Sequence, residues 1–252
     1  MEQGKLGEKV STQKVKALNK LLEATTSLEE LFTFLIEQQL GQIAFSTSLG
    51  QEDQVITHHI GTNKLPISVF TLDTGRLFQE TYDVLASTQQ KFKLPIEVYT
   101  PNHQAVAELV TTKGPNSFYE SVENRKECCA VRKIEPLKQA LKGKDVWITG
   151  LRQGQSQNRA DLAFFEYDEA FDIIKFNPLL HWSLDDVITY LNQFKVPQNS
   201  LHKKGFISIG CAPCTRAIAP DEDIRAGRWW WESSKKECGL PVSYTHLRAH
   251  ET

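Results

Sequence analysis

Residues 42–52 read Gln-Ile-Ala-Phe-Ser-Thr-Ser-Leu-Gly-Gln-Glu, a short apolar run that passes directly into a polar, glycine-containing loop. The run predicts a buried strand at 42–45, and a helix is expected at about 52–59. Hydroxyl groups, a glycine and the N–H groups that begin a helix can together bind phosphate or sulfate. The loop lacks the Gly-Lys-Ser/Thr ending of a Walker A motif, and a plain turn capped by serine fits this segment equally well.

The same alternation of strand and helix continues along the chain. Apolar runs predict further strands, and helical spacing of apolar residues predicts helices between them. We expect strands at 67–72, 96–99 and 145–150, and helices at 10–39 (with Ser27 as a cap), 82–92 and 131–141. This order predicts an α/β fold with a mostly parallel sheet flanked by helices. Each polar loop follows a strand, so the loops should meet at one edge of the sheet.

The last third of the chain is less regular. One apolar stripe predicts a helix at 183–194, and glycines and prolines then interrupt the pattern repeatedly up to the aromatic run Trp229-Trp230-Trp231. Because no internal repeat or low-complexity linker is present, we interpret the chain as one domain with an irregular C-terminal part.

Composition restricts the function further. The 252 residues are 40% hydrophobic and 24% charged, which excludes a disordered or fibrous protein, and the formal charge of −2 gives no reason to expect nucleic acid or an anionic membrane as partner. No apolar stretch is long enough to cross a bilayer, and the first residues lack the order of a secretory signal. We therefore expect a soluble, cytoplasmic protein.

The five cysteines are unevenly placed. Cys128 adjoins Cys129, Cys211 and Cys214 form a C-x-x-C, and Cys238 stands apart. Thiolates at this spacing suit zinc or an iron–sulfur cluster, which ligand number does not separate, and buried cysteines without metal are the alternative. Neighbouring residues on a helix point about 100° apart, so a site that uses both Cys128 and Cys129 needs local distortion or a wide cluster.

Cys238 lies in the segment Lys-Lys-Glu-Cys-Gly-Leu at 235–240. Two nearby lysines lower the pKa of a thiol, and the glycine permits movement, so Cys238 is a candidate nucleophile toward sulfur. A spare cysteine without a role is the alternative.

Basic residues surround the cysteine motifs in the sequence. In a chain of net negative charge they indicate an anionic ligand, because arginine binds phosphate and sulfate oxygens in pairs, whereas salt bridges on a solvated surface explain single members of the set. The set comprises Arg125, Lys126, Arg132, Lys133, Arg152, Arg159, Arg216, Arg225 and Arg228.

Several longer motifs, spread over residues 46–240, are specific to one family. They are Ser-Thr-Ser-Leu-Gly-Gln-Glu-Asp at 46–53, Leu-Asp-Thr-Gly-Arg at 72–76, Ser-Val-Glu-Asn-Arg-Lys-Glu-Cys-Cys at 121–129, Arg-Lys-Ile-Glu-Pro-Leu at 132–137, Thr-Gly-Leu-Arg at 149–152, Gln-Ser at 155–156, Ser-Ile-Gly-Cys-Ala-Pro-Cys-Thr at 208–215, Arg-Ala-Gly-Arg-Trp-Trp-Trp-Glu at 225–232 and Glu-Cys-Gly-Leu at 237–240. With them the chain resembles the assimilatory adenylyl-sulfate (APS) and phosphoadenylyl-sulfate (PAPS) reductases. The resemblance implies the adenine-nucleotide α-hydrolase-like fold with a modified PP-loop.

The resemblance also implies a chemistry. Members with the C-C…C-x-x-C set bind a [4Fe–4S] cluster and use adenylyl sulfate, so Cys128, Cys129, Cys211 and Cys214 would hold one cluster per chain. Cys238 would attack the sulfur of adenylyl sulfate, which expels AMP and leaves an S-sulfocysteine. Thioredoxin would then release sulfite. A homo-oligomer is the family expectation.

Substrate contacts follow from the same resemblance. The positive side chains would compensate the anionic substrate and nucleophile, two positions would contact the adenine, and the serine loop would hold the nucleotide near the ribose. The cations are Lys133, Arg159, Arg225 and Arg228, the adenine positions are Leu72 and Gly150, and the loop residues are Ser46, Thr47, Ser48 and Gly50.

One departure concerns the end of the chain. The family has His after Glu-Cys-Gly-Leu, where this sequence has Pro241, and the segment 241–252 matches nothing in the family. We interpret 1–40 as N-terminal helices, 41–240 as the reductase domain and 241–252 as a tail of foreign sequence.

Three alternatives to an adenylyl-sulfate reductase remain at this point. One is a cluster-containing reductase that uses phosphoadenylyl sulfate, and another is a non-enzymatic zinc or iron–sulfur module. An ATP pyrophosphatase or RNA thiolase of the same fold has less support, because the Ser-Gly-Gly-x-Asp-Ser loop is absent.

Overall fold

A six-stranded sheet forms the centre of the computed structural model, which describes residues 2–22, 27–155 and 161–232. The strand order is β3-β2-β1-β4-β6-β5, and every pair is parallel except β5 with β6. The strands are β1 (Ile43–Ser46), β2 (Ser68–Leu72), β3 (Glu97–Tyr99), β4 (Val146–Ile148), β5 (Phe165–Asp168) and β6 (Ile173–Phe176). The predicted mostly parallel α/β sheet is therefore confirmed.

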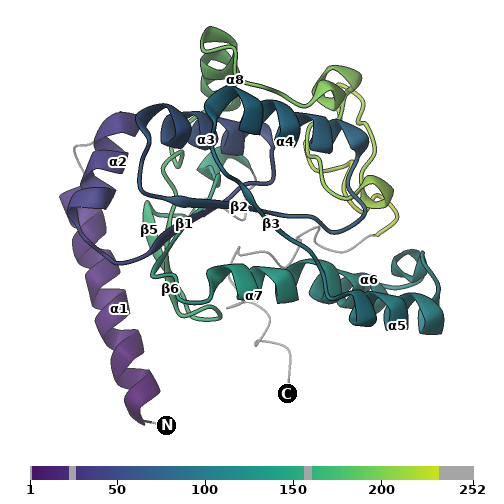
Figure 1. The fold of residues 1–252 in the computed structure, drawn as a ribbon, viewed down its shortest axis with the longest axis horizontal. Helices are drawn as coiled ribbons and strands as arrows, with labels where there is room; N and C mark the ends of the chain where they lie inside the picture. The colour runs from purple at the N-terminus through teal and green to yellow at the C-terminus, as the bar shows by residue number, and fades with distance from the viewer. Residues whose placement is uncertain (1, 23–26, 156–160, 233–252) are drawn as a thin grey trace.

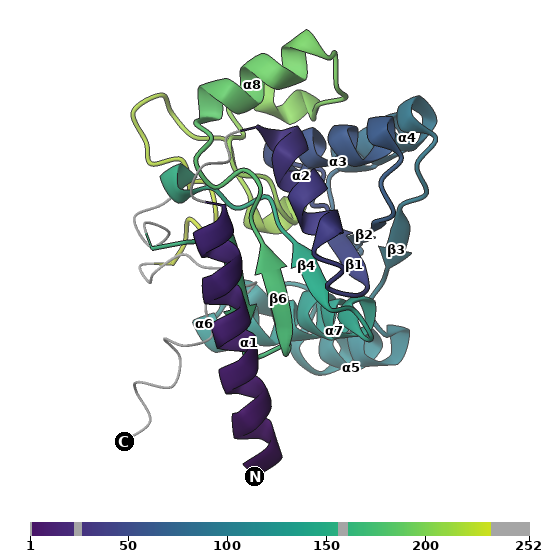
Figure 2. The ribbon, with the colours of Figure 1, turned by 90° about the vertical axis from the view of Figure 1, so that its left-hand side faces the viewer.

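Helices lie on both sides of this sheet. Figure 1 shows α3 and α4 on one side and α5, α6 and α7 on the other, and Figure 2 shows the same separation after a quarter turn. The helices are α1 (Glu2–Leu21), α2 (Leu28–Glu37), α3 (Gln51–Asn63), α4 (Gln79–Phe92), α5 (His103–Lys113), α6 (Val122–Cys129), α7 (Glu135–Leu141) and α8 (Leu184–Gln193).

Each face of the sheet buries its own apolar cluster. On one face Val55, Ile56 and Ile60 of α3 pack with apolar residues of α2 and α8, and on the other Leu137 and Leu141 of α7 pack against the strands. Strands buried on both faces carry continuous apolar runs instead of alternation, which is why these segments were recognisable in the sequence.

The second N-terminal helix begins at the predicted cap, whereas the first begins at Glu2, before the predicted start at residue 10. Ser27 caps α2 in a capping box: its hydroxyl accepts the Glu30 N–H at 3.1 Å, and the Glu30 carboxylate accepts the Ser27 N–H at 3.2 Å. In α1, Asn19 exchanges two hydrogen bonds with the Phe165 backbone at 2.8 and 2.9 Å. This contact attaches α1 to the outer edge of β5.

Several elements differ from the sequence prediction, and one of them is the helix α5 (His103–Lys113), which was not predicted. The helix expected at 131–141 continues one that begins at Val122, where Ser121 caps it, and a π-helical segment, η2 (Ala130–Ile134), joins α6 to α7. The first turns of this longer helix carry mostly polar residues, so no apolar stripe in the sequence predicted them. The hairpin of β5 and β6 was also missed, because Lys175 interrupts a four-residue strand; it is buried and pairs with Glu166 and Asp168.

The topology places the reversal of strand order, and with it the expected nucleotide crevice, between β1 and β4. Chain connections run from β1 to β2 on one side, while β4 adds on the other side of β1. In open parallel sheets ligands bind at the carboxyl ends of strands where the order reverses in this way. The loops after β1 and β4 therefore border the position where a nucleotide is expected.

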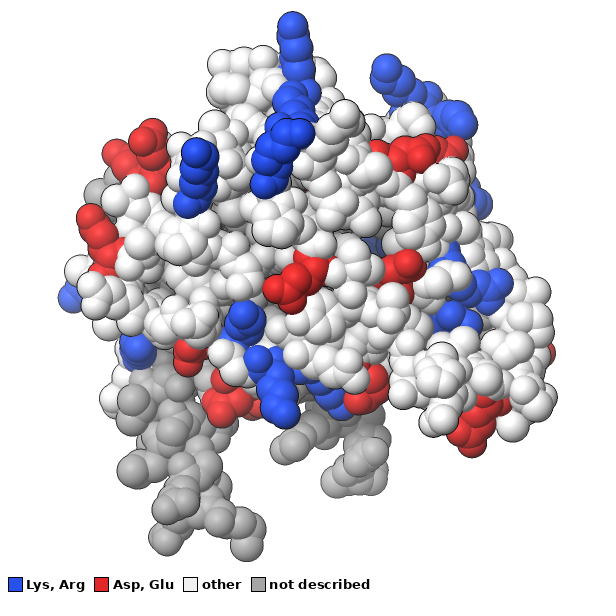
Figure 3. All heavy atoms as spheres, in the orientation of Figure 1, with Lys and Arg blue, Asp and Glu red and all other residues white. Residues whose placement is uncertain are grey.

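On the face in Figure 3, acidic and basic side chains are interspersed over the surface. Among the described residues, none of the helices combines the length and the apolar character that crossing a membrane requires.

The buried amide of Asn177, just after β6, joins three segments at this edge. Its oxygen accepts the Thr149 hydroxyl at 2.6 Å, and its nitrogen donates to Ala163 O at 2.8 Å and to the Glu166 carboxylate at 2.9 Å. We predict that Asn177→Ala lowers the free energy of unfolding by on the order of 2–3 kcal/mol, because buried polar groups lose their partners.

Urea or thermal unfolding of the apo protein measures the effect of Asn177→Ala. The control is Asn192→Ala on the exposed side of α8, which should change stability by less than about 0.5 kcal/mol. Equal stability of the two variants would contradict the role assigned to Asn177.

Candidate active site

The predicted site loops meet at the carboxyl edge of the sheet. Hydrogen bonds of the sheet continue into them: Thr47 N donates to Phe70 O at 2.8 Å, and Thr149 N donates to Phe176 O at 3.0 Å. The edge positions of the loops that follow β1 and β4 are therefore set by the sheet itself. Leu72, the last residue of β2, lies at this same edge.

The serine loop is bonded internally. Both the N–H and the hydroxyl of Ser48 donate to one carboxylate oxygen of Asp53 at 2.6 Å, and Gly50 N donates to the Ser48 hydroxyl at 3.3 Å. The Thr47 hydroxyl accepts Leu49 N at 3.0 Å. These N–H groups, expected to be available to an anion, have acceptors within the protein, so the Asp53 carboxylate occupies the place expected for an external anion.

Ser46 serves the sheet as well as the loop. Its hydroxyl accepts the indole N–H of Trp147 at 2.8 Å, which connects the end of β1 to β4 on the face that α7 covers. The hydroxyl of Ser46 therefore has a structural partner, while the neighbouring backbone turns toward α3.

Burial controls the ionisation of Asp53. Removal from water raises its pKa to about 6, the nearby Glu52 charge adds to the rise, and the two bonds from Ser48 oppose it. Gly150 is required here, because a Cβ on it would lie 2.1 Å from the Asp53 carboxylate. A larger residue at 150 would separate the two loops that border the crevice.

The four cysteines of the two motifs line one small cavity. Cys128 and Cys129 end α6, Cys211 precedes the short helix η6 (Ala212–Cys214), and Cys214 ends it. Lys133 and Arg132 of the π-helical segment line the same cavity. The π-helical segment directly after Cys129 is the local distortion that an adjacent cysteine pair was expected to need.

The thiols of this cavity are poorly solvated. Burial, and next the proximity of Cys211, raise the pKa of Cys214 to about 12, while Arg228 and Lys133 oppose the rise. Burial also raises the pKa of Cys128. Thiols in such a place ionise when a metal takes the thiolate.

The donor set fits an iron–sulfur cluster. Besides four cysteines on one cavity, four buried N–H groups nearby lack an acceptor among the described residues: Arg132 Nε, Arg228 Nε, Trp229 Nε1 and Trp231 Nε1. Cluster sulfurs accept such hydrogen bonds. Within the described part of the chain, no group of three or more His, Cys, Asp or Glu side chains is placed so that it could hold a metal ion.

Most arginines of the predicted anion-binding set have structural partners. Arg125 pairs with Glu232 at 2.6 and 3.0 Å, with each side chain 4% exposed. Arg132 Nη1 donates to Thr74 O at 2.8 Å. Arg152 pairs with Glu52, and Arg216 with Glu222. Each of these four arginines therefore contributes contacts within the protein, as the alternative interpretation expects for single members of the set.

Arg228 and Lys133 remain close to the cysteines. The Arg228 guanidinium lies 4.7 Å from the centre of the Trp229 ring, and a Cβ on Gly210 would lie 2.4 Å from Arg228 Nη2, so glycine makes room for this arginine. Arg225, on the loop before Arg228, donates its backbone N–H to Asp223 at 2.8 Å. Arg159, Cys238 and the tail 241–252 lie outside the described residues.

A larger cavity of about 570 Å³ opens beside the loop after β2. Its size is within the range of small-molecule sites. It shares Arg132 with the cysteine cavity, but none of the predicted substrate residues lines it; its lining includes Asp73, Gly75, Thr100, His103 and Val110. It is therefore distinct from the predicted nucleotide crevice.

Glu52 and Asp53 are two functional side chains whose partners were not predicted from the sequence. Both lie in the first turn of α3, where acidic side chains interact favourably with the helix dipole. The acidic pair at this position was the only sequence signal for these residues, and it indicates the start of a helix. It does not identify their partners Ser48 and Arg152, which the fold brings next to them.

Comparisons with known proteins agree with this geometry. Residues 42–217 match the model of the phosphoadenosine phosphosulfate reductase domain. An adenosine 5'-phosphosulfate reductase of Agrobacterium fabrum is 51% identical over 204 residues (81% of this chain and 78% of the relative), and one of Burkholderia cepacia is 46% identical over 235 residues (93% and 94%). The crystal structure of a phosphoadenylyl-sulfate reductase from Candida auris, a phosphate complex, has a TM-score of 0.70 at 28% identity, covering 82% of this chain and 98% of that one.

The raised pKa of Asp53 predicts a stability that falls with pH. The folded protein holds the proton up to about pH 6 and the unfolded chain only to about 3.8, so stability decreases as pH rises between these values. In Asp53→Asn this dependence should shrink by on the order of 2–3 kcal/mol.

Unfolding midpoints of the apo protein from pH 4 to 7 test the Asp53 prediction. Asp185→Asn, at an exposed position of α8, is the control and should retain the wild-type profile. An Asp53→Asn profile that follows the wild-type curve would show that Asp53 does not titrate in this range.

Proposed function

The chain belongs to the phosphoadenosine phosphosulfate reductase domain family, and from that membership we propose that it reduces adenylyl sulfate to sulfite and AMP in assimilatory sulfate reduction. The observation that carries the proposal is twofold: curated relatives named for this activity are 46–51% identical over most of both chains, and the four motif cysteines line one cavity. The substrate contacts proposed are Ser46, Thr47, Ser48, Gly50, Leu72, Lys133, Gly150, Arg159, Arg225 and Arg228.

The proposed reaction has two steps. The Cys238 thiolate attacks the sulfur of adenylyl sulfate, so that a sulfur–sulfur bond forms, the sulfur–oxygen bond to AMP breaks, and AMP leaves with that electron pair. A thioredoxin thiolate then attacks Sγ of Cys238 and expels sulfite, and the second thioredoxin thiol closes a disulfide that regenerates the Cys238 thiol. Thioredoxin is oxidised by two electrons, and sulfate sulfur is reduced to sulfite.

Cations should assist the first step. Nucleophile and substrate are both anionic, so their approach needs positive charge in a poorly solvated site. Arg228 and Lys133 support this role, because both charges already act on the buried Cys214 thiol. Arg225 and Arg159 are proposed to complete the set.

The proposed cofactor is one [4Fe–4S] cluster on Cys128, Cys129, Cys211 and Cys214. When bound, it would convert poorly ionising thiols to iron-bound thiolates and join α6 to the segment around η6. Buried indole and guanidinium N–H groups beside these cysteines are suited to donate to its sulfurs.

The second candidate is reduction of phosphoadenylyl sulfate, which the Candida auris relative acts on by its name. The Asp53 carboxylate disfavours it here, since it occupies the anion-binding part of the serine loop and would repel a 3'-phosphate placed nearby. A higher turnover with phosphoadenylyl sulfate than with adenylyl sulfate would favour the second candidate.

Trapping the intermediate tests the proposed nucleophile. Protein incubated with adenylyl sulfate and no thiol should gain the mass of one SO₃ on the peptide that contains Cys238, and thioredoxin should remove it as sulfite. Cys238→Ser should keep its iron content but form no adduct. An unmodified Cys238 in protein that still releases AMP would refute the mechanism.

Metal analysis tests the proposed cofactor. Anaerobically purified protein should contain about four iron and four acid-labile sulfide per chain. Cys211→Ser should lose most of both and be less stable, because the cluster joins separate segments. Stoichiometric zinc in place of iron would contradict the cluster.

A further inference from the structure

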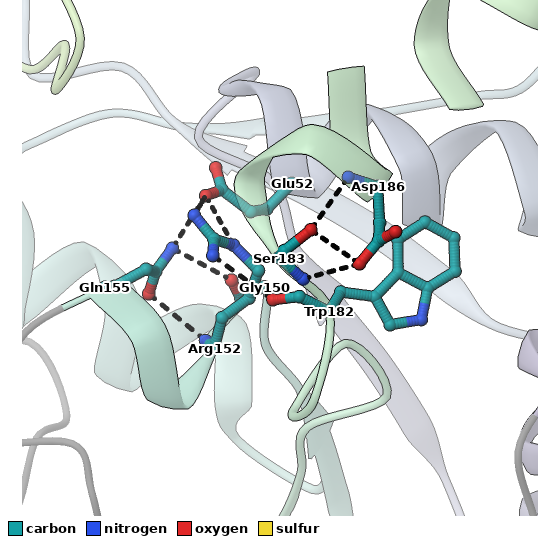
Figure 4. A network of polar contacts seen from close by, with 7 residues as sticks. All are labelled: Glu52, Gly150, Arg152, Gln155, Trp182, Ser183 and Asp186. Atoms are coloured by element: carbon teal, nitrogen blue, oxygen red, sulfur yellow. Dashed lines mark hydrogen bonds and ion pairs between the residues drawn. The ribbon is translucent and has the colours of Figure 1, made fainter. Parts of the chain in front are cut away.

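One oxygen of Glu52 collects three hydrogen bonds at the nucleotide edge of the sheet. Glu52 Oε1 accepts Arg152 Nε at 3.0 Å, Arg152 Nη2 at 2.8 Å and Gln155 Nε2 at 2.9 Å. Figure 4 shows the side chains of Arg152 and Gln155 converging on this atom. Glu52 belongs to the first turn of α3, and the other two belong to the loop after β4.

The remaining donors of Arg152 and Gln155 extend the network. Arg152 Nη1 donates to Trp182 O at 3.2 Å, in the segment between β6 and α8, where Ser183 and Asp186 form the capping box of α8. Gln155 also accepts the Arg152 N–H at 3.2 Å and donates to Gly150 O at 3.4 Å. Arg152 therefore connects the carboxyl ends of β1, β4 and β6 (Figure 4).

Burial makes this connection specific for arginine. The Arg152 side chain is 5% exposed and that of Glu52 is 20% exposed, so neither charge is well solvated without the other. The planar guanidinium reaches Glu52 and the Trp182 carbonyl at once, which a lysine ammonium cannot do with the same geometry. Because Glu52 neutralises it, Arg152 is unsuited to bind the substrate's anionic groups directly.

We propose that Arg152 is a positioning residue, which sets the spacing between the serine loop and Gly150 and thereby the affinity for the adenine nucleotide. The inference rests on the proposed function, because it takes this crevice to be the nucleotide site. Glu52 adjoins Asp53, which holds Ser48, and Gly150 lies against Asp53. A shift of Glu52 is thus transmitted to both walls of the crevice.

Electrostatics acts in the same direction. The Glu52 charge disfavours the ionised form of the buried Asp53, and Arg152 offsets that charge. Without Arg152, the uncompensated Glu52 would weaken the Asp53 carboxylate as acceptor for Ser48. The serine loop would then be held less tightly, even if its backbone conformation did not change.

The effect should appear in binding more than in chemistry. The cysteine cavity is lined mainly by residues of α6, η2 and the segment around η6, and among the described residues Arg152 hydrogen-bonds to none of these three segments. Loss of a residue that orients the nucleotide end of the substrate should therefore raise KM and leave kcat largely unchanged.

The test compares Arg152→Met and Arg152→Lys with a matched control, all as full-length protein loaded with cluster. Lys175→Met is the control, since it also removes a 5%-exposed cation paired with carboxylates, but from the strands β5 and β6. Calorimetry measures the Kd of AMP, which needs no turnover, and sulfite release gives KM and kcat for adenylyl sulfate. Thermal unfolding measures the stability of each variant.

Arg152→Met should weaken AMP binding and raise KM by about tenfold, with kcat within about threefold of wild type. Arg152→Lys should recover part of the affinity for AMP. If Arg152→Met does not fold, the comparison of Arg152→Lys with wild type tests the inference. Lys175→Met should lose comparable stability and bind AMP as wild type does.

Three results would overturn the inference. They are unchanged AMP affinity in both Arg152 variants, an equal loss of affinity in Lys175→Met, or a loss confined to kcat. If the wild-type protein forms sulfite from adenylyl sulfate, any of these three results refutes the role of Arg152 alone and leaves the proposed function intact. Wild-type protein that neither binds AMP nor forms sulfite would refute the proposed function and the inference together.

Discussion

Two adjacent carboxylates in the first turn of α3, Glu52 and Asp53, organise the edge of the sheet on which the site depends. Acidic residues at a helix start interact favourably with its dipole, but these two also reach outward in different directions. Asp53 holds the serine loop through Ser48, and Glu52 holds the loop after β4 through Arg152. Two like charges are thus kept side by side with little solvent. Hydrogen bonds from the surrounding donors offset the cost of their repulsion and desolvation.

The cysteine cavity follows the same principle with different groups. Arg125 is buried against Glu232 and also lies 4.7 Å from the centre of the Trp229 ring, so that one cation secures both the last described residue and the aromatic wall. Tyr119 donates to Pro213 O at 2.7 Å, which connects the region before α6 to η6. Two segments about eighty residues apart in sequence are therefore held together by contacts other than the cysteines. A metal would bind elements that the protein already brings together.

The architecture was predictable where burial dominates the sequence, and the site only where the motifs are unambiguous. Apolar runs such as 43–45 indicated the parallel strands correctly, because strands covered on both faces must be apolar throughout. The β5–β6 hairpin was missed since the charge of Lys175 is balanced by residues on the neighbouring strand, a compensation that no local pattern contains. In the same way the acidic turn at 52–53 indicated a helix start, but its partner Arg152 lies 100 residues away in the chain.

Pairing also divides the basic residues by role. The sequence places a dense set of arginines and lysines around the cysteines, and counting their charges suggests a strongly positive site. Arg125, Arg152 and Arg216 are each matched by a carboxylate, so their net contribution to the field at the site is small. Arg228 and Lys133 act on the buried Cys214 thiol, so an anion beside the cysteines would experience these two charges. Removal of either charge should therefore weaken the approach of two anions directly, whereas the arginines matched by carboxylates act mainly through the shape of the site.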